Sequence, residues 1–193
     1  ATGTIAACSP LLRMQCVTSE GDFDVKTQLI GTYNAENVLA TVAIGNYLGV
    51  SNDQIKAGLE NYQPRNNRSQ FTETDKNKLI IDAYNANPTS LLAAILNFAQ
   101  MEAPHKTLII GDMLELGSQS AEEHQKVVDL VNESGFTDVF LVGPNFNATR
   151  NKFSNFADVD LLKEYLQKNP LKNRFVLIKG SHGIHLERVI SEL

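Results

Sequence analysis

The chain lacks long apolar runs, abundant cysteine and an excess of positive charge, and each absence excludes a class of protein. No run of about 18 apolar residues occurs, so no membrane span is predicted, and the N-terminus shows no signal peptide. A formal net charge of -5 without a dense Lys/Arg stripe gives no general attraction to nucleic acid. With 42% hydrophobic and 20% charged residues, the composition favours a globular protein of the cytoplasm.

Metal-binding and disulfide patterns are also missing. Cys8 and Cys16 are the only cysteines, in neither a CxxC motif nor a Cys/His cluster, so we expect two reduced thiols and no structural zinc. His182 and His185 are three residues apart, but no carboxylate accompanies them in a metal-site pattern. We therefore predict no metal site and expect surface positions for the histidines, including His124 in the first turns of a helix.

Three catalytic or phosphate-binding motifs are absent: Gly-x-Ser-x-Gly, GxGxxG and GxxxxGK[ST]. Any nucleotide chemistry would therefore need machinery that these residues do not supply.

The first part of the chain predicts a hairpin followed by two helices. Glu20–Asp22 is a turn signal, and Gly49 and Ser51 separate the helices. Such a unit would bury little surface alone, so we expect it to be the end of a larger domain. Gln63–Arg68 is typical of a linker, which predicts domains at residues 1–62 and 63–193. The predicted elements are Leu11–Val17, Phe23–Ile30, Ala35–Leu48 and residues 52–61.

Strand and helix patterns alternate in the second part. This alternation predicts an α/β fold with a mostly parallel sheet covered on both faces. Ser120 and Glu123 are spaced as a capping box, with Gly135 ending that helix. The predicted strands are Lys78–Asp82, Thr107–Gly111, Asp138–Gly143, Phe153–Phe156 and Arg174–Lys179. The predicted helices are Pro88–Met101, Ala121–Ser134, Val159–Lys168 and Ile184–Leu193.

Polar groups gather where three of these strands end. Asp82–Pro88 contains a carboxylate, a phenol and amides, with Asn87-Pro88 as a helix start. Because ligands bind at the carboxyl ends of parallel strands, this loop predicts a binding site; local fixing of the loop is the alternative.

The other two loops are Gly111–Gly117 and Lys179–Gly183. Asp112 and Glu115 could assist acid/base or metal chemistry, or lie in a solvated loop. The Lys-Gly-Ser sequence could hold an anion, although short Gly-Ser turns are common.

A further motif, Gly31–Asn37, joins a strand to a helix. Helix capping would explain Asn34 but not Asn37, three residues later.

Taken together, the motifs resemble those of the Mur ligases in identity and order, over nearly the whole chain. Within the family, Tyr-Asn-Ala-Asn-Pro and Gly-Asp-Met-Leu-Glu-Leu-Gly favour the members that add D-alanyl-D-alanine, whereas the Asn-x-x-Asn and arginine features are shared with folylpolyglutamate synthetases. The matching segments are Gly31–Asn37, Pro64 with Arg68, Asp82–Pro88, Gly111–Gly117 with His124, and Lys179–Ser181.

The resemblance implies three domains in the intact enzyme: a UDP-binding domain, a central ATPase domain and a Rossmann-like C-terminal domain. This chain would comprise the end of the second and all of the third. The family's phosphate loop and the modified lysine that helps to hold Mg2+ would lie upstream. Tyr33 stands where the family usually has histidine.

The resemblance also implies residue roles, each suited to its chemistry. Asn34 and Asn37 would contact adenine, Arg68 the ATP phosphates and Asp82 the ribose hydroxyls. No residue is assigned a catalytic role. The incoming dipeptide and the closed-state contacts are assigned to Tyr84, Asn85, Asn87, Lys179 and Ser181.

The implied reaction uses ATP and Mg2+ to activate the carboxylate of UDP-N-acetylmuramoyl-tripeptide as an acyl phosphate, which D-Ala-D-Ala then attacks. This chain alone is expected to be inactive. Two alternatives are a noncatalytic nucleotide- or partner-binding α/β module and a folylpolyglutamate-synthetase-type ligase. A GxxxxGK[ST] motif upstream would support either ligase.

Overall fold

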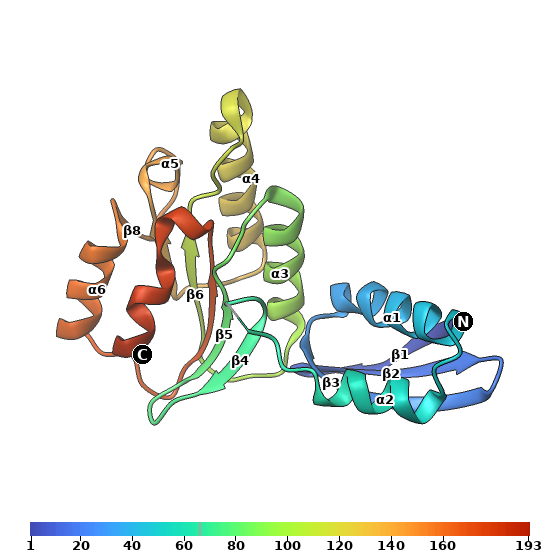
Figure 1. Ribbon diagram of the computed structural model, residues 1–193. Helices are drawn as coiled ribbons and strands as arrows, with labels where there is room; N and C mark the ends of the chain where they lie inside the picture. Colours follow the sequence, from blue (N-terminus) through green and yellow to red (C-terminus); the bar gives the residue numbers. More distant parts are fainter. Residues whose placement is uncertain (66) are drawn as a thin grey trace. The chain divides into compact units, whose positions relative to one another are not determined.

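The computed structural model describes residues 1–65 and 67–193 of the chain. Two compact units are present, Ala1–Arg65 and Asn66–Leu193 (Figure 1). The predicted linker includes Asn66, which lies outside the described residues. The first unit's origin as the end of a central ATPase domain stays a prediction.

The first unit is a three-stranded antiparallel sheet in the order β1-β2-β3 with two helices packed on it. The predicted hairpin and both helices are confirmed, but β1 was not predicted. β1 is an edge strand whose residues are mostly exposed, so its sequence carries little apolar alternation. The elements are β1 (Thr2–Cys8), β2 (Leu11–Thr18), β3 (Gly21–Ile30), η1 (Thr32–Asn34), α1 (Ala35–Tyr47) and α2 (Asn52–Asn61).

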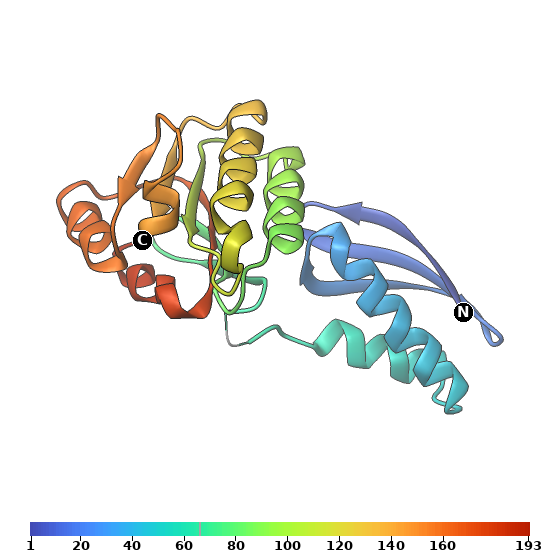
Figure 2. The same ribbon diagram turned by 90° about the horizontal axis from the view of Figure 1, so that it is seen from above.

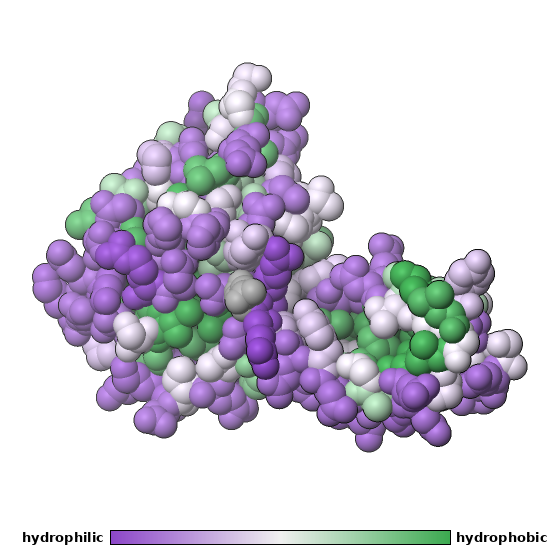
Figure 3. Space-filling model, viewed as in Figure 1, coloured by the Kyte–Doolittle hydropathy of each residue, from purple (hydrophilic) through white to green (hydrophobic). Residues whose placement is uncertain are grey.

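The core of the first unit lies between the sheet and these helices. Cys16 is fully buried there and Cys8 is partly buried. Burial, and secondarily the charge of Asp24, raises the pKa of the Cys16 thiol. Ile44 and Tyr47 instead lie exposed at the end of α1, where Figure 3 shows hydrophobic side chains at the surface.

The second unit is a six-stranded sheet in the order β4-β5-β9-β6-β7-β8. Only β4 is antiparallel, so the predicted mostly parallel α/β fold is confirmed. Its strands are β4 (Gln70–Glu73), β5 (Lys78–Asp82), β6 (Lys106–Gly111), β7 (Val139–Val142), β8 (Ser154–Phe156) and β9 (Phe175–Lys179). Its helices are α3 (Pro88–Gln100), η2 (Gly117–Gln119), α4 (Ser120–Glu133), α5 (Pro144–Asn147), α6 (Val159–Lys168), η3 (His182–Ile184) and η4 (Leu186–Glu192).

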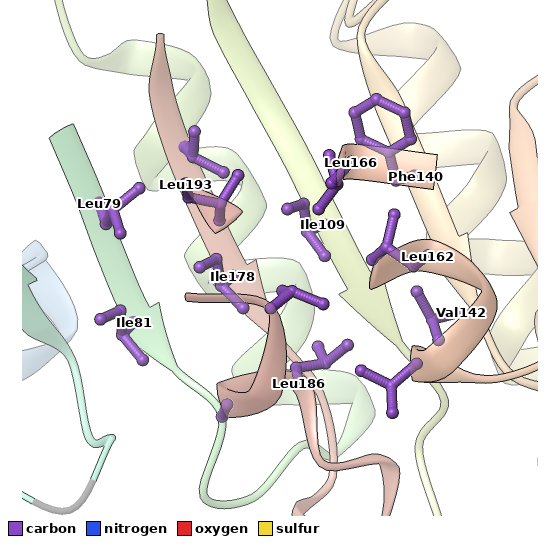
Figure 4. Packing of buried hydrophobic residues seen from close by; sticks show 14 residues of the cluster. Leu79, Ile81, Ile109, Phe140, Val142, Leu162, Leu166, Ile178, Leu186 and Leu193 are labelled. Atoms are coloured by element: carbon purple, nitrogen blue, oxygen red, sulfur yellow. The ribbon is translucent and has the colours of Figure 1, made fainter. Parts of the chain in front are cut away.

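Helices cover both faces of this sheet. α3 and α4 lie side by side on one face, and α6 with η4 covers the other (Figure 2). Leu79, Ile109 and Ile178 pack against Leu162 and Leu186 on the α6 face (Figure 4). Burial on both faces explains why the central strands are continuous apolar runs rather than alternating ones.

Two details of the second unit differ from the sequence prediction. The final helix is 3-10 rather than α-helical, and it follows a left-handed residue, His185, with φ of 59°. β4 was not predicted, because Gln70–Glu73 is short and only half-buried. Within the described ranges, no helix is both long and apolar enough to cross a membrane.

Candidate ligand-binding edge

Three polar loops meet at one edge of the parallel sheet, as the sequence predicts. They follow β5, β9 and β6, which are neighbours in that order. β5 and β6 lead to helices on the α3 face, whereas β9 leads to η4 on the opposite face. A reversal of this kind opens a crevice at the carboxyl ends of the strands, where α/β proteins bind ligands.

A buried ion pair joins two of these strand ends. Lys179 Nζ lies 2.6 Å from Asp82 Oδ2, and the side chains are 2% and 16% exposed. Nζ also donates to the carbonyl oxygen of Asn85 at 3.3 Å. The backbone N–H of Ser69 donates to the other carboxylate oxygen, Asp82 Oδ1, at 3.1 Å. Asp82 therefore faces the surface with two hydrogen bonds already formed and part of its side chain open to solvent.

Arg68 and Tyr84 form the exposed part of the site. The guanidinium carbon of Arg68 lies 3.8 Å from the centre of the Tyr84 ring, a cation–π contact. Tyr84 is 44% exposed, and its ring centre lies 6.0 Å from that of His182. This contact holds the cationic Arg68 against the loop that follows β5.

Asn87 and Asn85 have different surroundings in the loop after β5. The side chain of Asn87 accepts from the N–H of Ser90 at 2.8 Å, and the hydroxyl of Ser90 accepts from the N–H of Asn87. This capping box, with Pro88 at the first helical position, confirms the predicted helix start. Asn85 is exposed at the loop tip.

Ser181 is 5% exposed and bonds to both neighbouring loops. Its hydroxyl accepts from the N–H of Leu114 at 2.9 Å and donates to the carbonyl oxygen of Ala86 at 3.3 Å. Its own N–H donates to the carbonyl oxygen of Asp112 at 3.1 Å. Lys179 Nζ pairs with Asp82, and the hydroxyl and N–H of Ser181 are bonded within the fold. The Lys-Gly-Ser sequence therefore does not present these donors to an anion.

Asp112 is fully buried and bonded within the fold, so the solvated-loop alternative is wrong for this residue. Oδ1 accepts from the N–H of Phe146 at 2.9 Å, and Oδ2 accepts from the N–H and side chain of Asn145, both at 2.8 Å. The carboxylate thus satisfies the N-terminus of α5, a structural role rather than acid/base or metal chemistry. Gly143 lies directly against it, because a Cβ there would be 2.3 Å from Asp112 Cγ. Glu115 is exposed with φ of 66°.

The prediction of a surface position for His124 is wrong. This residue is fully buried, and its Nε2 accepts from the N–H of Met113 at 3.0 Å. Nδ1 lies 2.7 Å from the carbonyl oxygen of Ser120, so the ring carries its proton on Nδ1. Nε2 is 3.6 Å from Asp112 Oδ1, but a neutral ring forms no ion pair there.

The predicted capping box at Ser120 and Glu123 is also wrong. Ser120 lies inside α4, Gln119 is the N-cap, and no side chain caps this helix end. Glu123 pairs with Lys126 instead. The motif spacing was correct, but the 3-10 turn Gly117–Gln119 runs directly into α4 and moves the helix start. His105, His182 and His185 are exposed, as predicted.

Asn34 and Asn37 form a separate set in the first unit. The buried Asn34 side chain donates to the carbonyl oxygen of Ile30 at 2.7 Å and accepts from Asn37 Nδ2 at 3.0 Å. Asn34 is the N-cap of α1 but makes no side-chain capping bond. Its amide instead holds the exposed amide of Asn37.

Neither group of polar residues, at the sheet edge or around Asn34, forms a metal site among the described residues. Over residues 1–65 and 67–193, no three His, Cys, Asp or Glu side chains are grouped so as to hold a metal ion.

The second unit is an α/β domain with three polar loops at one sheet edge, and a family model identifies it further. The model described as "Mur ligase, glutamate ligase domain" matches residues 67–182, within the second unit. The chain belongs to the Mur ligase family.

The two relatives described next carry the name of the same Mur ligase. The UDP-N-acetylmuramoyl-tripeptide--D-alanyl-D-alanine ligase of Treponema pallidum is 34% identical over 86% of this chain and 38% of its own length. The ligase of the same name from Escherichia coli is 32% identical over 91% of this chain and 40% of its own. The chain thus spans about two fifths of these relatives.

Solved structures show the same likeness. The Acinetobacter baumannii structure titled UDP-N-acetylmuramoylalanyl-D-glutamyl-2,6-diaminopimelate--D-alanyl-D-alanyl ligase has a TM-score of 0.83 and 28% identity. The match covers 98% of this chain and 42% of that one. The likeness extends over both units of our chain.

Proposed function

We propose that this chain is the C-terminal part of an ATP-dependent ligase that adds D-alanyl-D-alanine to UDP-N-acetylmuramoyl-tripeptide. The observation that carries the proposal is the buried Asp82–Lys179 pair together with the Arg68–Tyr84 contact, at the sheet edge of a chain similar to ligases of that name. We infer the domains as residues 1–62, the end of a central ATP-binding domain, and 63–193, the C-terminal domain.

Each unit offers side chains suited to one part of a nucleotide. Because Asn34 fixes the amide of Asn37, the exposed amide is oriented before binding and can offer a donor and an acceptor to adenine. Asp82 would accept from the ribose hydroxyls. A carboxylate has about four lone-pair sites, and two are used here, so acceptor capacity remains.

Arg68 would bind the ATP phosphates. Its guanidinium rests on Tyr84, which leaves its N–H groups free to point outward and form a bidentate contact with phosphate oxygens. The same stacking limits the side chain's conformations before the nucleotide arrives, which lowers the entropy cost of binding.

The dipeptide would bind on the neighbouring loop. Tyr84 and Asn85 are exposed there and offer a phenol and an amide. Asn87, Lys179 and Ser181 are largely used within the fold: Asn87 caps α3, Lys179 pairs with Asp82, and Ser181 joins three loops. Their contribution to this subsite would therefore be mainly to shape the loop.

The proposed reaction has two steps. A carboxylate oxygen of the tripeptide attacks the γ-phosphorus of ATP, the bond to ADP breaks, and an acyl phosphate forms. The amine of D-Ala-D-Ala then attacks the acyl carbon, loses a proton, and expels inorganic phosphate. Positive side chains such as Arg68 would offset the charge on the transferring phosphoryl group. Mg2+ would be held by the ATP phosphates and by residues outside this chain.

The test is a ligase assay of the longer protein that carries this chain, with ATP, Mg2+ and two substrate pairs. The expected product is the muramyl pentapeptide precursor from UDP-N-acetylmuramoyl-tripeptide and D-Ala-D-Ala. Elongation of a folate by glutamate would instead support a folylpolyglutamate-synthetase-type ligase. Nucleotide binding with no product from either pair would support a noncatalytic module.

A further inference from the structure

A continuous set of hydrogen bonds joins the three loops at the sheet edge, and the side chains at its centre, Ser181 and His124, are buried. Ser181 lies at its centre and contacts the loops after β5 and β6 through one hydroxyl group. From Leu114 the set continues to Met113, whose N–H is bound by His124. His124 is in turn fixed on α4 by the carbonyl oxygen of Ser120.

We propose that Ser181 and His124 are positioning residues, which fix the dipeptide loop Ala83–Asn87 against the loop Asp112–Leu116 without touching substrate. This inference rests on the proposed function. The hydroxyl of Ser181 has one proton and it points to Ala86, while Leu114 occupies an acceptor site. A substrate contact would have to compete with one of these bonds.

His124 bonds to the loop Asp112–Leu116 at Met113, the neighbour of Leu114. It is fully buried and both its nitrogens are bonded to backbone groups, so it has no atom to offer a ligand. Two consecutive backbone N–H groups, of Met113 and Leu114, are thus held by side chains from different elements. A loop fixed at consecutive amides has little freedom, and the Ser181 hydroxyl joins it to Ala86, which holds the loop of Tyr84 and Asn85 in one arrangement.

Asp82 is fixed independently of this set. Its partners are Lys179 and the N–H of Ser69, neither of which bonds to Ser181. Loss of the Ser181 hydroxyl should therefore disturb the dipeptide side of the site more than the nucleotide side. A positioning role therefore predicts a selective effect on the dipeptide side, whereas a general loss of stability would affect both sides alike.

The first readout is amide hydrogen exchange in the 193-residue chain, which needs no activity. Ser181→Ala should raise the exchange rate of the Leu114 amide about tenfold, at the upper end for one lost hydrogen bond. The Ile109 amide, in a central strand, should stay within about twofold and reports global stability. Ser181→Cys should be intermediate, and Ser118→Ala, an exposed serine, should match wild type. An unchanged Leu114 rate in Ser181→Ala overturns the inference.

The second readout is steady-state kinetics of the longer ligase. Ser181→Ala should raise KM for D-Ala-D-Ala several-fold and leave KM for ATP within about twofold. His124→Asn should raise the same KM, although it does not touch Ser181. A normal dipeptide KM in His124→Asn would mean that Ser181 contacts substrate directly, and would overturn the positioning role.

The two readouts also separate the two proposals. A ligase that is inactive as wild type would contradict the proposed function, whereas Leu114 exchange would still decide whether Ser181 fixes the loop. If His124→Asn does not fold, as an altered Ile109 rate would reveal, the Ser181 variants still decide the matter.

Discussion

Lys179 Nζ lies 2.6 Å from Asp82 Oδ2, and this bond ties the ends of two neighbouring parallel strands together. The lysine is 2% exposed, so its charge has left water and depends on Asp82 and the carbonyl oxygen of Asn85. The pair therefore both stabilises the sheet edge and orients the carboxylate that we assign to the ribose.

Breaking this ion pair should destabilise the protein. We expect Lys179→Met to lower the free energy of unfolding by about 3 kcal/mol, because Asp82 is left as a largely buried, unpaired charge. Lys78→Met is the matched control: its pair with Glu73 is exposed, and its loss should cost less than about 0.5 kcal/mol. Urea unfolding followed by circular dichroism measures both. Equal effects would show that burial of the Asp82–Lys179 pair is unimportant.

Arg68 should matter for ATP use in the longer ligase. Arg68→Ala should lower kcat/KM for ATP by a factor equivalent to about 2–4 kcal/mol, the range for a lost charged donor to a phosphoryl group. Arg68→Lys should recover only part, since lysine cannot make the bidentate contact or the same stack on Tyr84. If both variants behave like wild type in steady-state kinetics, Arg68 has only a linker role.

Gly143 should tolerate no side chain. It has φ of 121°, and a Cβ would lie 2.3 Å from Asp112 Cγ, so Gly143→Ala must displace the carboxylate that caps α5. We expect a loss of about 3 kcal/mol in the free energy of unfolding. Gly135→Ala is the control: its φ is also positive, at 75°, but no atom lies within 4 Å. Its cost should be about 1 kcal/mol, from backbone strain alone. Similar costs at both positions would contradict the role of Asp112.

The boundary between the units should be the first site of proteolysis. Early cuts by a nonspecific protease should fall at residues 61–69 and leave a resistant C-terminal core, because each unit has its own buried cluster. We expect residues 1–62 to be degraded faster, since Ile44 and Tyr47 leave apolar surface open there. Mass spectrometry of the fragments checks this. A protected fragment that keeps β2 and β3 after cuts between Lys78 and Lys179 would contradict the boundary.

The sequence predicted the central elements of the second unit well. β5 and α6 match the predicted bounds, since an apolar run and a capped amphipathic helix are strong local signals. β1 and β4 were missed, because exposed or short edge strands carry a weak pattern. The strand order could not be predicted from the sequence either. β9, the last strand along the chain, lies between β5 and β6, and residues far apart in the sequence make the contacts that place it there.

For the candidate site, the sequence placed three polar loops at one sheet edge, but not which of their side chains are buried. Asp112 and Asp82 are both carboxylates at strand ends, yet one caps α5 and the other pairs with Lys179 and is partly exposed. That difference depends on Gly143, some 30 residues further along the chain. His124 gave no local sign of burial, because its partners, Met113 and Ser120, bind it through backbone atoms that any residue has.

The most direct test of the proposed chemistry follows oxygen atoms through the reaction. The longer protein that carries this chain would be given ATP, D-Ala-D-Ala and UDP-N-acetylmuramoyl-tripeptide labelled with oxygen-18 in the carboxylate that is to be joined. Mass spectrometry would then locate the label. If the carboxylate is activated as an acyl phosphate, each inorganic phosphate released carries one labelled oxygen. Label in AMP, or amide product formed with unlabelled phosphate, would contradict the account.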